Sequence, residues 1–587
     1  MPKYDAERGV FIFQQGERLS RRALLKLATG AASSVAIATF LAACGGDDND
    51  TSSSTTSVSD GSSSPASSDV TPAANSDGTP KKGGRLRVGY VEPPTLDPDF
   101  HSSSSGGNII GMVYDSLLIQ DPNTSEYVAG PLTESFEVSQ DTKTWTFHLK
   151  KDITYHDGST LEAAHLKAIY EFAVDPDNAT FVTGIYLPPD PTFEAPDPQT
   201  FVISSPLPYG PMASHLFWDA WMGVWPPAAR EKYGADFGRN PVGSGPFKFK
   251  EWAAGDHLLL ERFDNYTWGA SFLENKGPAY LDELFFKFTP EQSTIINGLQ
   301  SGELDIAFLP NQFYDQFKSN PDFEILSRPS GRLDCLGWNN ERWPFDDLKT
   351  RQALMYGFDR ERFLQVMEGG HGQVMYGAIV PALPHYWPGE QEAGPKFDLS
   401  KAKSLLADAG WADENGDGII EKDGKPFDAV LISGGSEAEV RWASLVQQQA
   451  KDLGINVTIE TLESAALTAR RNSGDFDLYY FIYDTVDPDI IWFFFHSQQI
   501  PTEGSSGLNW GRVNDPILDD LIIKQRNTIG SDRDAAVQAM VERMMDQASV
   551  LPLYAPEKNT VFNKKVKGVI FYPNAMDWEL TEAWIDD

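Results

Sequence analysis

The stretch from residue 428 to residue 462 constrains the fold of this chain more than any other. DAVLIS (428–433) has the apolar run of a buried strand, and SEAEVRWASLVQQQAKDLG (436–454) follows it as an amphipathic helix. INVTIETL (455–462) then alternates between apolar and polar residues, which is typical of a second strand. A strand, a helix and a strand in this order predict a βαβ unit with parallel strands and a right-handed crossover.

Other stretches extend this α/β pattern. FDLSKAKSLLADAGW (397–411) repeats apolar residues with a helical period, and Gly410 stands where a left-handed C-cap is expected. TWTFHLKKDITYHDGSTL (144–161) predicts a strand, a turn, a second strand and a second turn. Hairpins together with βαβ units indicate α/β lobes rather than a sandwich or a bundle. On the helix at 436–454 we expect one buried side, made by Val440, Ala443, Val446, Ala450 and Leu453.

The N-terminal residues predict export and a lipid anchor. SRRALLK (20–26) follows the twin-arginine pattern, and the small and apolar residues from Leu27 to Ala43 suit the hydrophobic part of a signal peptide. LAAC, which ends at Cys44, resembles the lipobox of bacterial lipoproteins, in which the cysteine is lipidated. We therefore expect residues 1–43 to be a twin-arginine lipoprotein signal peptide, and an uncleaved N-terminal anchor is the alternative. Both interpretations place the bulk of the chain outside the cytoplasmic membrane.

The next segment, residues 44–84, is rich in Ser and Thr and has almost no apolar side chains. Such a segment cannot bury enough surface to fold, so it predicts a disordered tether. About 500 residues remain from Arg85 onward, which is too many for one ordinary core and enough for two or three lobes.

Charge and cysteine content narrow the possible partners. The formal net charge is −36, and residues 1–43 carry six basic and three acidic residues, so the remainder carries −39. A surface this negative disfavours nucleic acid and anionic lipid as partners. With Cys44 assigned to the lipobox, Cys335 is the one cysteine left, so disulfides do not stabilise the chain. The apolar neighbours of Cys335 indicate a buried strand residue.

Five long stretches then carry a family resemblance. GPLTESFEVSQDTKTWTFHLKKDITYHDGSTLEAAHLKAIYEF (130–172) closely resembles the N-terminal signature of family 5 extracellular solute-binding proteins, which are dipeptide-, oligopeptide- and nickel-binding components of ABC importers. Four more stretches match in the same order, at residues 240–266, 281–310, 345–363 and 397–427. The resemblance covers the chain from about residue 84 to the end.

The resemblance implies an α/β fold of two lobes, the class II periplasmic-binding-protein fold in its large peptide-binding subtype. Lobe I would comprise residues 85–333 and 552–587, with an extra subdomain at about 125–235, and lobe II would comprise residues 334–551. Two crossings between the lobes would form a hinge, and closure of the lobes would enclose the ligand.

The stretch YYFIYDTVDPDIIWFFF (479–495) sets three aspartates among apolar side chains. Asp487 has the sequence context of a helix N-cap, with Pro488 at the first helical position and Asp489 in the first turn. Asp484 follows a run of strand length, at the end where open α/β sheets place ligand crevices. In peptide-binding family members, an Asp in a corresponding D-x-x-D-P setting receives the α-ammonium of the peptide, and Asp484 matches it. The alternative is an Asp held by an internal Lys, Arg or backbone amides.

The resemblance places further candidate ligand-binding residues near the cleft. Amides there would serve an extended peptide backbone, and indoles would stack on side chains or sugar faces. A Trp beside a strand is more often part of a core, which is the alternative for the two indoles. The candidates are Trp338, Asn339, Asn340, Asn509, Trp510, Tyr90 and Leu96.

The segment DENGDGIIEKDG (413–424) resembles a calcium loop. Asp413, Asn415 and Asp417 copy positions 1, 3 and 5 of an EF-hand, but the twelfth position is Gly424, so the bidentate Glu is missing. Asn-Gly and Asp-Gly also form turns without a metal. The loop is a weak calcium candidate, and no other metal site is predicted.

The function that these observations indicate is solute capture. No Gly-x-Ser-x-Gly, His-Glu-x-x-His or zinc-type Cys/His motif occurs, so we expect no catalysis and no cofactor. We expect a lipid-anchored, monomeric substrate-binding protein that delivers a di- or oligopeptide to an ABC permease. The alternative ligands are an oligosaccharide, for which 15 Trp supply stacking faces, and, less favoured, nickel. A surface-anchored hydrolase is the remote alternative.

Overall fold

The structure is a computed structural model. It describes residues 3–5, 10–14, 18–19, 73–74, 78–101, 104–178, 180, 186–217, 223–502, 507–572 and 578–586. The predicted lipidation residue Cys44, and most of the predicted signal peptide and tether, lie outside these residues.

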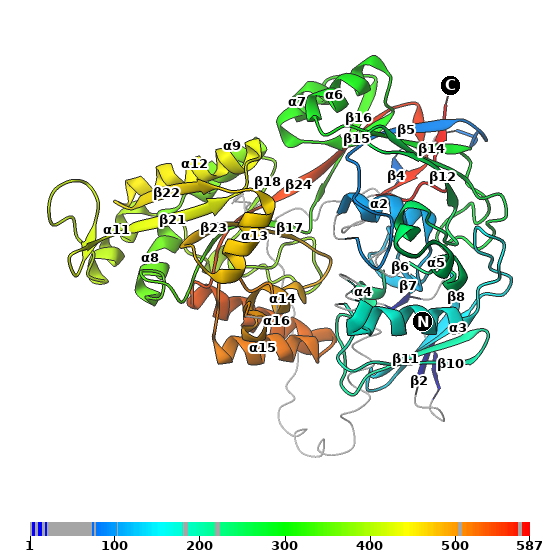
Figure 1. Cartoon of the computed structure of the whole chain (residues 1–587), viewed down its shortest axis with the longest axis horizontal. Coiled ribbons are helices and arrows are strands. Elements are labelled where there is room, and N and C mark those ends of the chain that lie inside the picture. Colours follow the sequence, from blue (N-terminus) through cyan, green and yellow to red (C-terminus); the bar gives the residue numbers. More distant parts are fainter. Residues whose placement is uncertain are drawn as a thin grey trace, which may run out of the picture.

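Two lobes share one long strand, β24 (Leu551–Asn563), which runs between them in Figure 1. From Glu557 onward it pairs with β16 (Phe323–Pro329) of lobe I. Before that point it pairs with β17 (Arg332–Trp338) and β18 (Gly372–Val374) of lobe II. The second crossing is the short segment between β16 and β17. The predicted bilobal α/β architecture with two crossings is therefore confirmed.

The sheet of lobe I continues outward from β24. Its further strands are β5 (Arg85–Tyr90), β12 (Phe247–Ala253), β13 (His257–Arg262), β14 (Glu283–Phe288) and β15 (Ile306–Leu309). They lie in the order β12-β13-β14-β5-β15-β24. The helices of this part are α2 (Ser104–Val113), α6 (Gln292–Ser301) and α7 (Tyr314–Lys318).

A second sheet builds the lower part of lobe I in Figure 1. Its strands are β1 (Lys3–Asp5), β2 (Val10–Gln14), β8 (Thr133–Ser139), β9 (Thr144–Leu149), β10 (Thr192–Asp197) and β11 (Thr200–Ser204), in the order β1-β2-β8-β9-β11-β10. A smaller sheet joins β3 (Arg18–Leu19), β6 (Leu118–Gln120) and β7 (Tyr127–Ala129). The helices here are α3 (Ala163–Val174), α4 (Met212–Phe217) and α5 (Pro227–Tyr233).

The strand prediction for residues 144–161 is half right. β9 begins at Thr144 as expected, but the second predicted strand is reduced to a single bridge between Thr154 and Thr160. The backbone there closes a tight turn, in which Tyr155 accepts the N–H of Gly158 and donates to Ser159. The pairing ends after the Leu161 N–H donates to the Ile153 carbonyl, because the chain then turns into α3 at Ala163.

Lobe II contains the predicted βαβ unit. β21 (Asp428–Ser433) and β22 (Asn456–Thr461) are parallel, and α12 (Glu437–Asp452) connects them. A reciprocal capping box between Ser436 and Glu439 starts the helix. The expectation for Val440 is wrong, because this side chain is 45% exposed. Trp442, fully buried, sets the centre of the buried face, and Val440 lies on the opposite side of the helix.

Helices cover both faces of the lobe II sheet, which also holds β23 (Leu478–Asp484). One core includes residues of α8 (Leu348–Gly357), α9 (Arg360–Glu368), α11 (Leu399–Asp408) and α12, and the other includes α14 (Ile490–Phe495), α15 (Pro516–Arg526) and α16 (Gly530–Asp546). Alternate residues of β17 serve the two cores, and Cys335 is a fully buried strand residue as predicted. The predicted C-cap Gly410 has φ +91°.

Short elements complete the fold. They are β4 (Ala73–Ala74), β19 (Glu421–Lys422), β20 (Lys425–Pro426), β25 (Val566–Lys567), β26 (Val569–Ile570), β27 (Trp584–Ile585), α10 (Glu390–Ala393) and α13 (Ser464–Ser473).

A buried carboxyl, that of Asp115, lies within the core of lobe I. It accepts hydrogen bonds from the hydroxyl of Tyr266 (3.2 Å) and the indole N–H of Trp268 (2.9 Å). Burial raises the pKa of Asp115 to about 7, although these donors and Lys150 favour the charged form. Between about pH 4 and pH 7, the Asp115 carboxyl is therefore protonated in the folded protein and ionised in the unfolded chain.

We predict that Asp115→Asn changes how stability depends on pH. The free energy of unfolding of the parent should fall as the pH rises from about 4 to about 7, by at most about 4 kcal/mol, because the folded pKa is raised. The variant has no carboxyl to titrate at this position and does not lose this stability. The melting temperature of the variant minus that of the parent should therefore be larger at pH 8 than at pH 4.5. Asp177→Asn, at an exposed acid of the same lobe, is the control. An equal difference at both pH values would show that Asp115 does not titrate in this range.

Candidate ligand site between the lobes

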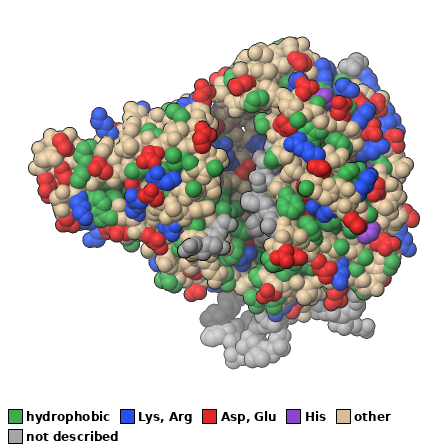
Figure 2. Space-filling view, viewed as in Figure 1, with side chains coloured by type: hydrophobic (Ala, Val, Ile, Leu, Met, Phe, Trp, Pro, Cys, Tyr) green, Lys and Arg blue, Asp and Glu red, His purple; other side chains and the backbone are tan. Residues whose placement is uncertain are grey.

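Figure 2 shows a hollow between the two lobes. The chain crosses into lobe II at Ser330 and Gly331, and β17 begins directly afterwards, at Arg332. β23 runs antiparallel to β17 and ends at Asp484, which lies opposite Arg332. These two side chains therefore share one face of the sheet at the junction of the lobes.

Gly331 fits the crossing against the end of β23. A Cβ at this position would lie 2.0 Å from the carbonyl oxygen of Thr485 and 2.9 Å from a carboxylate oxygen of Asp484. The Thr485 N–H donates to the Gly331 carbonyl at 3.3 Å. Only glycine allows this approach, so the crossing itself positions Asp484 beside the hinge.

A buried polar cluster orients Arg332. Its guanidinium donates two hydrogen bonds of 2.7 Å to Asp334, which is fully buried. Asp334 also accepts the hydroxyl of Tyr480 at 2.6 Å. A bidentate pair of this kind fixes the plane of the guanidinium. Asp484 lies beyond this cluster and is exposed to solvent, and it is the last residue of β23 rather than the first residue after it.

The structure places five of the other candidates in the loops and core of lobe II, and three of them lie at the end of β17. The Trp338 indole is fully buried and donates to the Ala548 carbonyl at 3.0 Å. The Asn339 amide donates to the Gly474 carbonyl (2.9 Å), and the Asn340 amide donates to Gly511 (2.9 Å) and Ser549 (3.2 Å). These contacts hold neighbouring loops together.

Asn509 and Trp510 differ in exposure. Asn509 is fully buried, and its side chain bonds to the His496 carbonyl and to both backbone groups of Val513, at 2.8–3.1 Å. Trp510 is half-buried, and the Arg471 guanidinium lies 4.8 Å from its ring centroid. Of the two, only the indole of Trp510 retains an exposed part.

Tyr90 and Leu96 lie in the core of lobe I. The Tyr90 hydroxyl accepts from the Asn108 amide at 2.8 Å, and its ring packs 5.5 Å from that of Phe286. Leu96 is fully buried, and its backbone N–H donates to Gly238. Both side chains pack below the surface of the lobe.

The interpretation of Asp487 as a helix N-cap is wrong. α14 begins at Ile490, and Asp489 occupies the N-cap position without a side-chain cap bond. Asp487 and Asp489 are fully buried and pair with Arg533 and Arg526 respectively. Burial alone would raise the pKa of Asp487, but the pairing with Arg533 lowers it well below its ordinary value. In the sequence, the capping pattern is local and easy to recognise. The two ion pairs are not, because each arginine lies some 40 residues after its aspartate.

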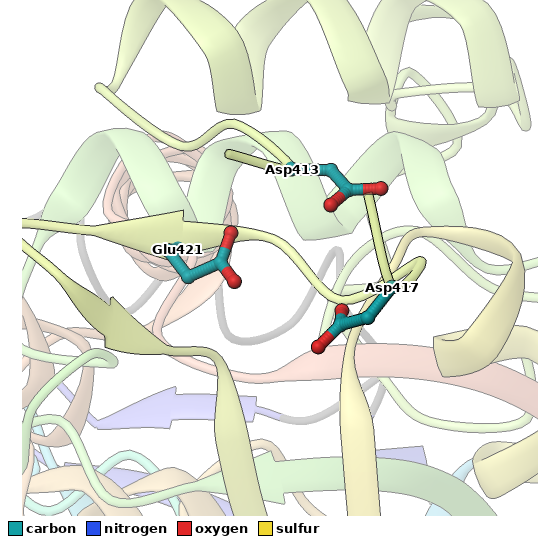
Figure 3. A group of neighbouring side chains, drawn as sticks. All are labelled: Asp413, Asp417 and Glu421. Carbon is teal, nitrogen blue, oxygen red and sulfur yellow. The ribbon is translucent and has the colours of Figure 1, made fainter. Parts of the chain in front are cut away.

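The calcium-like loop brings a third carboxylate to the motif. Figure 3 shows Asp413, Asp417 and Glu421 gathered together, with one oxygen of each within 4.8 Å of the others. Glu421 is the ninth residue of the motif. Asp413 accepts the N–H of Gly416 (2.7 Å), and Glu421 accepts the amide of Asn415 (2.7 Å). These bonds account for the motif as a turn, and the metal assignment stays a prediction.

Comparison with known families decides what kind of protein this is. Residues 128–501 match the family model described as bacterial extracellular solute-binding proteins, family 5, middle region. That match spans well over half of the chain. The chain belongs to family 5 of the bacterial extracellular solute-binding proteins.

Individual family 5 proteins resemble the chain over most of its length. The oligopeptide-binding protein AppA of Bacillus subtilis is 28% identical over 539 residues, which cover 87% of this chain and 94% of AppA. The solved structure of AppA with a nonapeptide superposes with a TM-score of 0.71, covering 87% of this chain and 100% of that one. The glutathione-binding protein GsiB of Salmonella paratyphi A is 27% identical over 382 residues, 64% of this chain and 69% of GsiB.

The fold is shared with binders of other solutes. NikZ of Campylobacter jejuni, solved in complex with Ni(L-His), has a TM-score of 0.71 at 23% identity and covers 85% of this chain and 97% of its own. This likeness shows the fold alone. Family 5 proteins are solute-binding components of ABC importers that work outside the cytoplasm, so the general role of this chain is binding rather than catalysis. Within the described residues, no helix combines the length and hydropathy needed to cross a membrane.

We predict that Asn509→Ala destabilises the protein by roughly 2–4 kcal/mol, because buried backbone groups of His496 and Val513 lose their partner. Thermal unfolding would show this as a lower melting temperature. Asn456→Ala, which removes an exposed amide from the same lobe, is the control. An unchanged melting temperature together with weaker ligand binding would instead place Asn509 at the ligand.

Proposed function

We propose that this protein is the lipid-anchored substrate-binding component of an ABC importer and that it captures a di- or oligopeptide between its lobes. The observation that carries the proposal is the exposed carboxylate of Asp484 at the junction of the lobes, in a D-x-x-D-P setting. The similarity to oligopeptide-binding AppA over nearly the whole chain supports the ligand class.

The charges at this end of the lobe II sheet suit an ammonium group. The carboxylate of Asp484 is exposed on the same face of the sheet as Arg332, whose guanidinium is held by Asp334. A peptide α-ammonium beside Asp484 would make charge-assisted hydrogen bonds worth about 1.5–3 kcal/mol. Trp510 is the aromatic candidate that retains an exposed part for contact with a peptide side chain.

Lobe closure would deliver the captured solute. β24 and the crossing at Ser330 and Gly331 are the joints about which the lobes turn. A ligand that contacts both lobes shifts the protein toward the closed form, which then docks on the permease. We expect the protein to act as a monomer.

The lipid anchor would come from Cys44. Cleavage before this residue removes β1 to β3, which leaves β8 as an edge strand still paired with β9. Residues 44–84 then tether the folded lobes to the membrane surface.

The alternative ligand is an oligosaccharide, for which the 15 Trp of the chain are the argument. The burial of Trp338 weakens that argument, because an indole inside the core offers no face to a sugar.

We predict that peptides raise the melting temperature of the mature protein and that Asp484→Asn removes most of the effect. A ligand that binds only the folded state stabilises it by about 2.7 kcal/mol at a hundredfold excess over Kd. The screen would compare di- to pentapeptides, their N-acetylated forms, cello- and xylo-oligosaccharides and nickel-histidine. N-acetylated peptides should bind roughly 10- to 100-fold more weakly, because the ammonium is gone.

The control for this screen is Asp408→Asn, at an exposed acid on α11 far along the chain from the hinge. A shift with sugars alone, unchanged in Asp484→Asn, would contradict peptide capture and assign Asp484 a structural role.

We predict that Cys44→Ser abolishes lipidation and releases the protein from the membrane fraction. The measurement is incorporation of radiolabelled palmitate in a bacterial host, followed by fractionation. Cys335→Ala is the matched control, because Cys335 is the chain's one other cysteine and is buried. Label retained by Cys44→Ser would show that the anchor, if any, is attached elsewhere.

A further inference from the structure

The lobes meet a second time, away from the hinge. Tyr209, Gly210 and Ser214 of lobe I, at the start of α4, contact α14, α15 and the beginning of α16 in lobe II. The Gly210 N–H donates to the Arg526 carbonyl at 2.7 Å, and the Ser214 hydroxyl donates to Asp487 at 2.5 Å. The Tyr209 hydroxyl donates to Asp489 at 3.3 Å. We call these contacts the interlobe bridge.

All the ionic pairing in the bridge lies within lobe II. Arg533 pairs with Asp487 through both terminal nitrogens, and Arg526 lies 2.9 Å from Asp489. Gln525 links the two pairs, because its amide donates to Asp489 and its oxygen accepts from Arg533. The four charged side chains are at least 90% buried.

Among the described residues of the bridge, lobe I contributes neutral groups. These are two hydroxyls, one backbone N–H and the imidazole of His215, whose pKa is lowered by burial. A buried ion pair that loses one partner leaves an uncompensated charge, which is strongly unfavourable. Separation of these lobes breaks no ion pair, because each arginine stays with its aspartate and water replaces only neutral donors. The bridge is therefore built for reversible contact.

The bridge also packs closely. A Cβ at Gly210 would lie 2.4 Å from the Thr528 carbonyl oxygen and 3.0 Å from the Arg533 side chain, and all three nearest atoms belong to lobe II. The rings of Tyr186 and Phe493 lie 5.6 Å apart across the same contact, and Val486 of lobe II packs into the core of lobe I. Contact of this kind requires glycine at position 210.

We propose that the interlobe bridge is a latch, formed when the lobes close, that slows the release of the bound solute. This inference rests on solute capture by lobe closure, as proposed above. Ser214 and Tyr209 act as positioning residues, because they hold the closed arrangement without being assigned a contact with the ligand.

The first test measures the distance between the lobes, both without ligand and with any peptide found by the thermal screen. Spin labels on Asp141→Cys and Lys403→Cys report this distance by double electron–electron resonance, since both positions are exposed and lie on different lobes. The measurement uses the mature protein without its lipid anchor. Gly210→Ala should shift the distribution to longer distances, because the added methyl collides with Thr528. Gly277→Ala is the control, since its Cβ would meet nothing closer than 3.5 Å.

The second test measures release of a peptide found by the thermal screen. Ser214→Ala and Tyr209→Phe should each raise the dissociation rate about 10- to 100-fold and leave the association rate nearly unchanged, because a hydroxyl–carboxylate bond is lost only from the closed state. Tyr170→Phe, which removes a buried hydroxyl with no partner among the described groups, is the control.

The outcomes separate the latch from the function on which it rests. Longer distances in Gly210→Ala and in Ser214→Ala, with Gly277→Ala unchanged, support the latch even if no peptide binds. Distance distributions that match the parent in both variants overturn it, even if peptides bind tightly. Dissociation rates that stay at the parent value in Ser214→Ala and Tyr209→Phe also overturn it.

Discussion

The ladder of hydrogen bonds along β24 is the interaction on which the rest of the structure depends. One strand completes the sheets of both lobes, with β15 and β16 on one half and β17 and β18 on the other. Neither sheet can lose this strand, so the lobes remain joined while the short stretch between the two halves turns. The same geometry brings the end of β23 to the junction, because β23 pairs along the full length of β17. The position of Asp484 thus follows from the way in which the lobes are connected.

Each buried aspartate near the moving parts is paired within its own lobe. Asp334 pairs with Arg332, Asp487 with Arg533, and Asp489 with Arg526, all in lobe II. In lobe I, Arg87 makes two hydrogen bonds to the buried Asp305. Because a separated buried pair is so unfavourable, pairing across the lobes would resist opening. At the interlobe bridge, the described groups that lobe I contributes to the contact are therefore neutral.

Periodicity and turn chemistry predicted what depends on neighbours in the chain. The βαβ unit at 428–461 and the C-cap at Gly410 are local, and the structure has both. Trp338 and Asn509 are different, because a tryptophan or an asparagine suits a ligand site as well as it suits a buried structural position. Their burial depends on partners such as Ala548 and His496, which packing brings near. A sequence shows the amide or indole but not the carbonyl that accepts its hydrogen bond.

Asp484 and Asp487 make the same point within four residues. Asp484 ends the strand and Asp487 lies between that strand and the next helix, yet one is exposed and the other is fully buried. Asp487 is buried together with Arg533, which lies 46 residues further along and reaches it from the first turn of α16. An acid that receives an arginine of its own lobe becomes part of the framework. Exposure at the junction of the two lobes is what makes Asp484, rather than Asp487, the candidate for a cation that arrives from solution.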